Sequence, residues 1–61
     1  LPSASNYILY EKPNNESNIL LEDNSNVDVK ILDETKYYYK VELTKEGKDY
    51  TGYINKDKIT K

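Results

Sequence analysis

Cysteine, histidine, arginine, tryptophan, phenylalanine and methionine are all missing from this sequence of 61 residues. Without cysteine the chain forms no disulfide bond, and without cysteine or histidine it lacks the usual ligands of structural zinc. A domain of this length lies near the lower limit for folding without such cross-links, so its stability must come from an apolar core. We therefore expect a single domain that holds no metal and no cofactor.

The basic residues are nine lysines, and eleven carboxylates give the chain a net charge of −2. Both signs are spread along the sequence and form no basic patch. Because arginine is the preferred residue for phosphates and base edges, its absence indicates that nucleic acid is not a partner. No apolar run approaches the ~20 residues of a membrane helix, so we expect no membrane insertion. Without histidine or cysteine, and with no deep pocket expected in so small a fold, we do not expect an enzyme.

Residues 37–54 hold five of the seven tyrosines and are the segment around which the fold is organised. The alternation over 37–43 predicts a strand with Tyr37, Tyr39, Val41 and Leu43 on one face. A polar turn over 44–49 leads to a second strand over 50–54, completing a hairpin. We expect Gly47 to take a positive φ in the turn and Gly52 to mark a bulge or a close backbone approach.

The rest of the chain predicts short strands at 7–10, 19–21 and 27–31 and a last strand at Ile59, with polar loops at 14–18 and 22–26 and a helical turn at 55–58. Residues 1–6 have linker composition, so the domain is expected over 7–61. No segment has the 3.6-residue apolar period of a helix. These signals predict an all-β fold, a small, partly open barrel of five to six short antiparallel strands. The expected core residues are Tyr7, Leu9, Ile19, Leu21, Val27, Val29, Ile31, Tyr39, Val41, Leu43, Ile54 and Ile59.

Four segments in order resemble the bacterial SH3 (SH3b) family: Ile8 to Pro13, Val27 to Leu32, Tyr38 to Val41, and Gly52 to Ile54 followed by Ile59. The resemblance covers residues 7–59 and implies an SH3-like barrel. Similarity to the cell-wall-binding members implies a peptidoglycan ligand. Tyr38 replaces the usual tryptophan, and the loop at 44–49 is longer than a minimal hairpin. Asn55 and Lys58 stand where eukaryotic SH3 domains have proline and tyrosine, so recognition of proline-rich segments is not expected.

Strand alternation places Ile8, Tyr10, Tyr38 and Tyr53 together on the outward side of the strands, where tyrosine rings could bind a peptide or a glycan. We therefore expect Tyr10, Tyr38 and Tyr53 to bind the ligand; the other interpretation is that they cover the edges of the core. Tyr37, Tyr39 and Tyr50 are expected to be structural. The leading hypothesis is a non-catalytic binding or targeting module of a larger secreted or surface bacterial protein. It would be extracellular or associated with the cell wall, and would bind peptidoglycan or a peptide. The alternative is a structural spacer, or an interaction domain that docks on adjacent domains of its parent chain.

Overall fold

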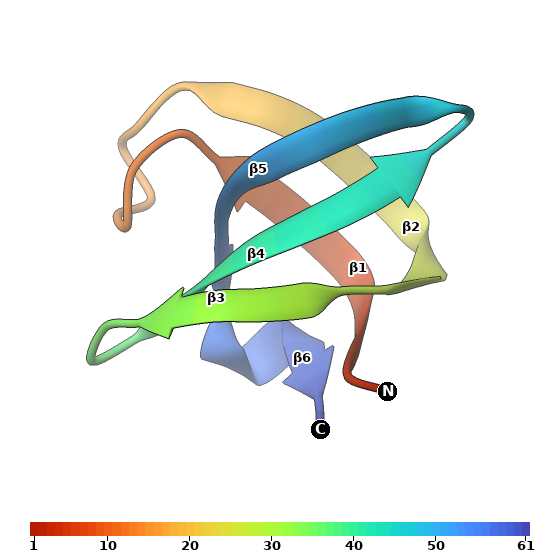
Figure 1. The fold of residues 1–61 in the computed structure, drawn as a ribbon. Helices are drawn as coiled ribbons and strands as arrows, with labels where there is room; N and C mark the ends of the chain where they lie inside the picture. The colour runs from red at the N-terminus through yellow and green to blue at the C-terminus, as the bar shows by residue number, and fades with distance from the viewer.

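The computed structural model describes all 61 residues and contains six strands and one short 3-10 helix (Figure 1). The elements are β1 (Ser3–Tyr10), β2 (Ile19–Asp28), β3 (Lys30–Glu34), β4 (Tyr38–Lys45), β5 (Lys48–Asn55), η1 (Lys56–Lys58) and β6 (Ile59–Thr60). The predicted all-β fold class is confirmed, as are the short helical turn and the final strand at Ile59. None of the helical residues forms a segment long and apolar enough to cross a membrane.

The strands form one antiparallel sheet in the order β2-β1-β5-β4-β3, with β6 beside β1. β2 and β3 lie at opposite ends of this order, yet only Val29 separates them along the chain. The sheet therefore curls until its two ends approach, which gives a small barrel-like globule with a Cα radius of gyration of 10.0 Å. We expected one strand over 27–31; instead the chain bends at Val29, which is buried and donates its backbone N–H to the carbonyl of Pro2 at 3.0 Å.

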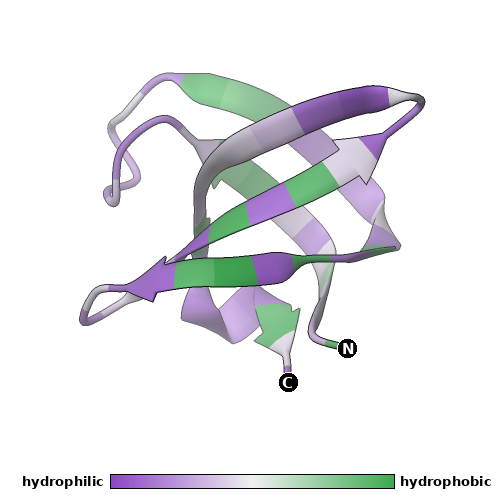
Figure 2. Ribbon diagram, viewed as in Figure 1, coloured by the Kyte–Doolittle hydropathy of each residue, from purple (hydrophilic) through white to green (hydrophobic).

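The core predicted from strand alternation is largely confirmed. Figure 2 shows hydrophobic and hydrophilic residues alternating along β4, where Val41 and Leu43 are buried and Glu42 is exposed. The buried cluster comprises Ala4, Tyr7, Leu9, Val29, Tyr39, Val41, Leu43 and Ile54, with Leu21, Val27, Ile31, Tyr50 and Ile59 packed against it. Ile19 is wrong as a core residue, because it opens β2 directly after an exposed loop and is 53 % exposed.

The first strand starts at Ser3, so the expectation of a linker over residues 1–6 is wrong for residues 3–6. Ala4 lies between two neighbours, since it pairs with Val27 of β2 on one side and with Ile59 of β6 on the other. This double pairing buries Ala4 completely. A short polar sequence thus becomes part of the sheet because the end of the chain returns to it.

The polar segment 22–26 is also part of the sheet and not the loop that we expected. β2 runs through it without a break but is bulged there, because Asn24 and Ser25 lie opposite the single residue Asn6 of β1, which has a φ of 48°. Side chains stabilise this irregular pairing: Asp23 Oδ1 accepts the backbone N–H of Ser25, and Asn26 Nδ2 donates to Ser5 Oγ. Polar residues stabilise the strand here because one side chain satisfies a backbone N–H within the bulge and another bonds across to β1.

The hairpin between β4 and β5 is tighter than the sequence suggested. Its turn consists of Glu46 and Gly47 alone, because β4 continues to Lys45 and β5 begins at Lys48. Both turn residues have positive φ, 53° for Glu46 and 78° for Gly47, the arrangement of a two-residue type I′ turn. The positive φ predicted for Gly47 is confirmed, and the expectation of a longer loop over 44–49 is wrong.

Candidate functional site

A groove of about 420 Å³ crosses the surface where β1, the loop after it, β4, the end of β5 and η1 meet. Its lining consists of Asn6, Ile8, Tyr10, Asn15, Tyr38, Asn55, Asp57 and Lys58. We call these eight residues the tyrosine groove. They come from four separate segments of the chain, so the site exists only in the folded barrel.

Two tyrosine rings form the floor of the tyrosine groove. The rings of Tyr10 and Tyr38 meet edge to face, with centroids 6.2 Å apart and planes at 82°. This geometry is favourable because the positive edge of one ring meets the negative face of the other. Ile8, two residues before Tyr10 on β1, extends the same apolar surface.

Gly52 allows β1 and β5 to approach closely enough to build this floor. A Cβ atom on Gly52 would lie 2.6 Å from the carbonyl oxygen of Tyr10 and 3.0 Å from Cγ of Leu9. The expected close backbone approach at Gly52 is therefore confirmed. This close approach fixes the position of Tyr10 at the end of β1.

The structure brings together two of the three tyrosines that the sequence singled out. Tyr10 and Tyr38 share the groove, whereas Tyr53 does not line it. Tyr53 is half-buried on the same side of the sheet, since it pairs with Tyr10 of β1 and with Lys40 of β4. The shared outward side predicted from alternation is correct, but Tyr53 lies outside the hollow.

Tyr38 is more deeply placed than expected. The sequence predicted an exposed ring, but only 8 % of Tyr38 is accessible. Its backbone closes the turn between β3 and β4: Tyr38 N–H donates to Thr35 Oγ1 at 3.0 Å, and Tyr38 C=O accepts from Thr35 N–H at 2.8 Å. Its ring packs against the ring of Tyr10. The expectation of an exposed Tyr38 ring is therefore wrong.

Tyr37 and Tyr39 differ from each other although both were expected to be structural. Tyr39 is buried in the core. Tyr37 precedes β4 and is 63 % exposed, so its side chain contributes little to the core. Its backbone does contribute, because the Tyr37 carbonyl accepts the N–H of Lys56 at 2.9 Å and so attaches η1 to the sheet.

The hydroxyl groups on the groove floor are free to bind a ligand. Neither Tyr10 nor Tyr38 forms a side-chain hydrogen bond within the chain, and no buried side-chain oxygen or nitrogen lacks a partner. The tip of Tyr38 therefore reaches the surface even though its ring is buried. The floor presents an apolar surface edged by two phenolic hydroxyls, each able to donate or accept.

The rim of the groove is polar and close to neutral. It carries one carboxylate, Asp57, one ammonium group, Lys58, and the side-chain amides of Asn6, Asn15 and Asn55. Our prediction of binding residues missed this rim. The pair Asn55 and Asp57 did carry a signal, because asparagine is a favoured residue immediately before a helical turn.

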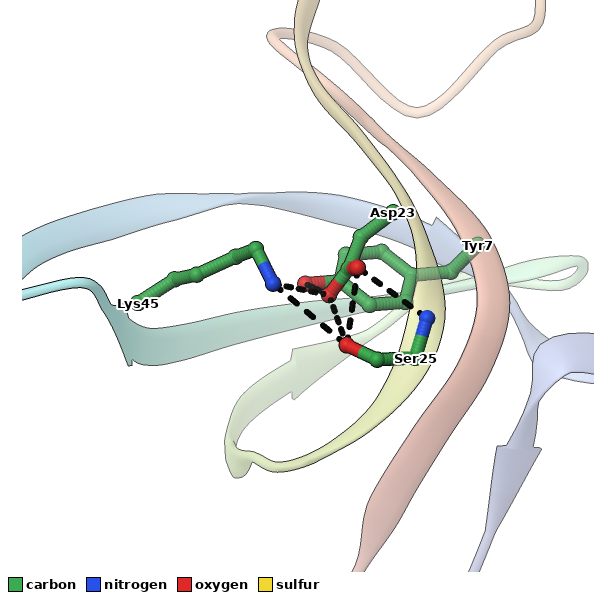
Figure 3. A network of polar contacts seen from close by, with 4 residues as sticks. All are labelled: Tyr7, Asp23, Ser25 and Lys45. Carbon is green, nitrogen blue, oxygen red and sulfur yellow. Dashed lines mark hydrogen bonds and ion pairs between the residues drawn. The ribbon is translucent and has the colours of Figure 1, made fainter.

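A second polar cluster lies on the other face of β1 and is drawn in Figure 3. Tyr7 donates its hydroxyl to Asp23 Oδ2 at 3.0 Å, and Lys45 Nζ lies 3.0 Å from the same oxygen. Ser25 Oγ donates to Asp23 as well, at 2.8 and 2.9 Å from its two oxygens. We call these four residues the acid cluster. It joins β1, β2 and β4 through one carboxylate.

The pKa values of the acid cluster follow from these contacts. The backbone N–H of Ser25 is the main reason that the pKa of Asp23 lies well below its usual range, and Lys45 lowers it further against the opposing effect of burial. Burial is the main cause that raises the pKa of Tyr7 well above its usual value, and the bond to Asp23 adds to it. No buried side-chain oxygen or nitrogen of this cluster lacks a partner, so it is a structural feature of the barrel.

A wider and more open hollow of about 1070 Å³ lies beside the bend at Val29. No aromatic side chain lines it, and its charged residues are Asp28, Lys30, Glu42 and Asp49. An open surface without an aromatic anchor holds a small ligand poorly. The tyrosine groove is therefore the better candidate site.

In neither hollow are three or more histidine, cysteine, aspartate or glutamate side chains arranged to hold a metal ion. The tyrosine groove offers apolar surface, hydroxyls and amides. Comparison of the chain with protein-family models, with curated proteins and with solved structures finds no match.

Proposed function

We propose that this domain is a non-catalytic binding module of a larger secreted or surface bacterial protein, and that it binds peptidoglycan or a related peptide in the tyrosine groove. One observation carries the proposal: the edge-to-face pair of Tyr10 and Tyr38, whose hydroxyls have no partner within the chain. A pair of this kind offers a ligand both an apolar contact and two hydrogen bonds.

The chemistry of the groove, with one carboxylate and one ammonium group on its rim, suits an extended polymer of low net charge. A bound chain can lie over Ile8 and the two rings while its polar groups meet the amides of the rim. The resemblance of four segments to SH3b domains supports peptidoglycan as the source of that chain and the cell wall as the location. Asn55 and Lys58 replace the proline and tyrosine of eukaryotic SH3 domains, which favours a ligand other than a proline-rich segment.

The size of the groove is consistent with a targeting role. Each net hydrogen bond contributes about 1 kcal/mol and the two rings add a small apolar contact, so a single site of this kind binds weakly. Weak binding is sufficient for a tethered module, because the polymer offers many copies of the ligand and the linked domain gains a high local concentration. In this proposal, the other domains of the parent protein carry out its activity.

Sedimentation with purified sacculi tests the proposal. We expect the wild-type domain to sediment with the sacculi, and Tyr10→Ala to remain largely in the supernatant because half of the groove floor is lost. Tyr37→Ala is the matched control, since Tyr37 is an exposed tyrosine outside the groove. Equal retention of Tyr10→Ala and wild type would exclude the groove as the binding site, and no retention of the wild type would refute the wall ligand.

A second candidate function is docking on an adjacent domain of the parent chain. It is favoured by the exposed apolar residues outside the groove, Ile19 and Leu20 on β2 and Leu32 on β3. Because β2 and β3 are the end strands of the sheet order, a neighbouring domain could cover both. The double variant Ile19→Ser, Leu20→Ser should then loosen domain contacts in the intact parent protein while leaving sacculus retention unchanged.

A further inference from the structure

Asn55 is the groove residue whose orientation the structure fixes most completely. It is the last residue of β5 and stands immediately before η1. Its Oδ1 accepts the backbone N–H of Asp57 at 2.8 Å. Since a backbone N–H can pair only with an acceptor, this bond decides which end of the side-chain amide is oxygen and which is nitrogen.

The nitrogen of that amide is left for a ligand. Asn55 Nδ2 has no hydrogen-bond partner within the chain. Because no buried side-chain nitrogen or oxygen of the protein lacks a partner, Nδ2 must reach the surface. Asn55 lines the tyrosine groove and pairs across the sheet with Tyr38. Its free N–H groups therefore lie at the edge of the aromatic floor.

From this geometry we infer that Asn55 is a ligand-binding residue, which donates through Nδ2 to a backbone carbonyl oxygen of a peptide lying in the groove. The inference rests on the proposed binding function and specifies its ligand as the peptide part of the wall polymer. It involves the side chain of Asn55 alone, because η1 is only three residues long and its backbone contributes no site of its own.

The chemistry favours a peptide backbone, which offers an amide carbonyl at each residue, over the glycan, where only the N-acetyl groups carry one. With Oδ1 engaged, Asn55 presents only donors to the groove, so its partner must be an acceptor. A peptide carbonyl is a strong acceptor that recurs at each residue of an extended chain. Such a chain can contact the rings of Tyr10 and Tyr38 through its side chains while one of its carbonyls meets Nδ2.

The role in binding can be separated from the role in capping η1. Aspartate and serine both serve as helix caps, so Asn55→Asp and Asn55→Ser should keep the bond to Asp57 N–H and the melting temperature of the wild type. Neither variant has the Nδ2 donor. Asn24→Asp and Asn24→Ser are the controls, because Asn24 is exposed on β2 and lies outside the groove.

The experiment measures binding of two soluble probes made from purified sacculi: peptides released by an amidase, and glycan strands freed of peptide. We expect the peptides to bind the wild type and both Asn55 variants to bind them about tenfold more weakly, since one ligand carbonyl loses its donor. The Asn24 variants should bind like the wild type. In the wild type, the side-chain NH₂ signals of Asn55 should shift in an NMR titration with the peptides.

Several results would overturn the inference. Wild-type binding by both Asn55 variants would show that the side chain only caps η1. Loss of binding in Asn55→Asp alone would show that added negative charge, and not a missing donor, is the cause. Binding of glycan strands instead of peptides would refute the ligand class. If Asn55→Ser melts early, unchanged Asn55 NH₂ signals in the wild-type titration would still refute the contact. Failure of the proposed function can be told apart from failure of this inference, because the wild type would then not bind sacculi at all.

Discussion

Tyr7 and Tyr10 lie three residues apart on β1, yet the fold uses them in opposite ways. Tyr7 points into the barrel and is 1 % exposed, and its hydroxyl donates to Asp23 in the acid cluster (Figure 3). Tyr10 lies on the outer side against Tyr38, and its hydroxyl has no partner within the chain. One tyrosine donates its hydroxyl hydrogen within the fold, whereas the hydroxyl of the other has no partner in the chain.

The comparison shows which property of a tyrosine bears on function. Burial alone does not distinguish the two sites, because Tyr38 is nearly as inaccessible as the core residues and still lines the groove. What differs is whether the hydroxyl is satisfied inside the protein. A buried ring with a free tip at the surface is available for binding, and a buried ring with a bonded tip stabilises the fold.

The largest effect on stability should come from Gly52→Ala, because Gly52 packs against β1, the strand that carries both Tyr7 and Tyr10. The added Cβ would lie 2.6 Å from the Tyr10 carbonyl oxygen, so β1 and β5 must move apart. We expect the free energy of unfolding to fall by about 3 kcal/mol, as in overpacked cores. Urea unfolding followed by circular dichroism measures it. A loss below about 0.5 kcal/mol would show that the strands separate at little cost.

Removal of one hydroxyl from either site should give opposite results. Tyr7→Phe should lower the free energy of unfolding by about 1 to 2 kcal/mol, since a buried bond to a carboxylate is lost, and should leave sacculus binding unchanged. Tyr38→Phe should leave stability within about 0.5 kcal/mol of the wild type and weaken binding several-fold. The comparison between the two sites fails if both variants change the same property.

A change of pH should act mainly on the acid cluster. The pKa of Asp23 is lowered in the folded state, so its contribution to stability is complete above the unfolded value near 4 and is lost as pH falls below it. Melting temperatures between pH 7 and pH 2.5 should show this loss, and it should be smaller in Asp23→Asn. Glu34→Gln is the control. The ion pair with Lys56 also lowers the pKa of Glu34, but because that pair is exposed, its removal should change the acid dependence of the melting temperature less than Asp23→Asn does.

At alkaline pH a second group, Tyr7, should make stability fall as the pH rises. The pKa of Tyr7 is raised in the folded state, so its contribution is complete below the unfolded value near 10 and is lost as pH rises above it. Tyr7→Phe should flatten the melting curve above pH 10 relative to the wild type. An unchanged alkaline dependence in that variant would show that Tyr7 does not stay protonated in the fold.

The smallest effect is a stabilising one that touches neither site. Glu46 adopts a φ of 53° in the type I′ turn, where asparagine is preferred. We expect Glu46→Asn to raise the free energy of unfolding by about 0.5 kcal/mol and to leave binding and pH dependence unchanged. Thermal unfolding measures the gain. A destabilised variant would indicate that the Glu46 side chain has a role that its exposed position does not suggest.

The sequence predicted those parts of the fold in which local pattern and tertiary environment agree. Alternation in 37–43 and 50–54 located the central hairpin, and Val27, Val29 and Ile31 were correctly turned toward the core. It failed for residues 3–6 and 22–26, which are polar and carry no strand signal. These segments become strands because β1 pairs with β2 along most of its length and, at residues 3 and 4, also with β6, a long-range effect that no local pattern records.

The candidate site was predicted in part for the same reason. Alternation correctly put Ile8, Tyr10, Tyr38 and Tyr53 on one side of the strands. It did not show that the sheet curls enough to bury Tyr38 and to leave Tyr53 outside the groove. The polar rim, with Asn55 and Lys58, comes from segments that meet only after folding, so only the capping pattern at Asn55 could have indicated it.

The pairing of β1 with β6 has a mechanical consequence. Ser3 lies opposite Thr60 and Ala4 opposite Ile59, so the two ends of the chain lie side by side (Figure 1). If further polypeptide is attached at both ends, it joins the barrel at a single place, and the barrel lies to one side of the line between the attached segments. Tension along such a polypeptide pulls first on this short antiparallel pair, whose hydrogen bonds open one after another. The direct line of force does not run through β4 and β5.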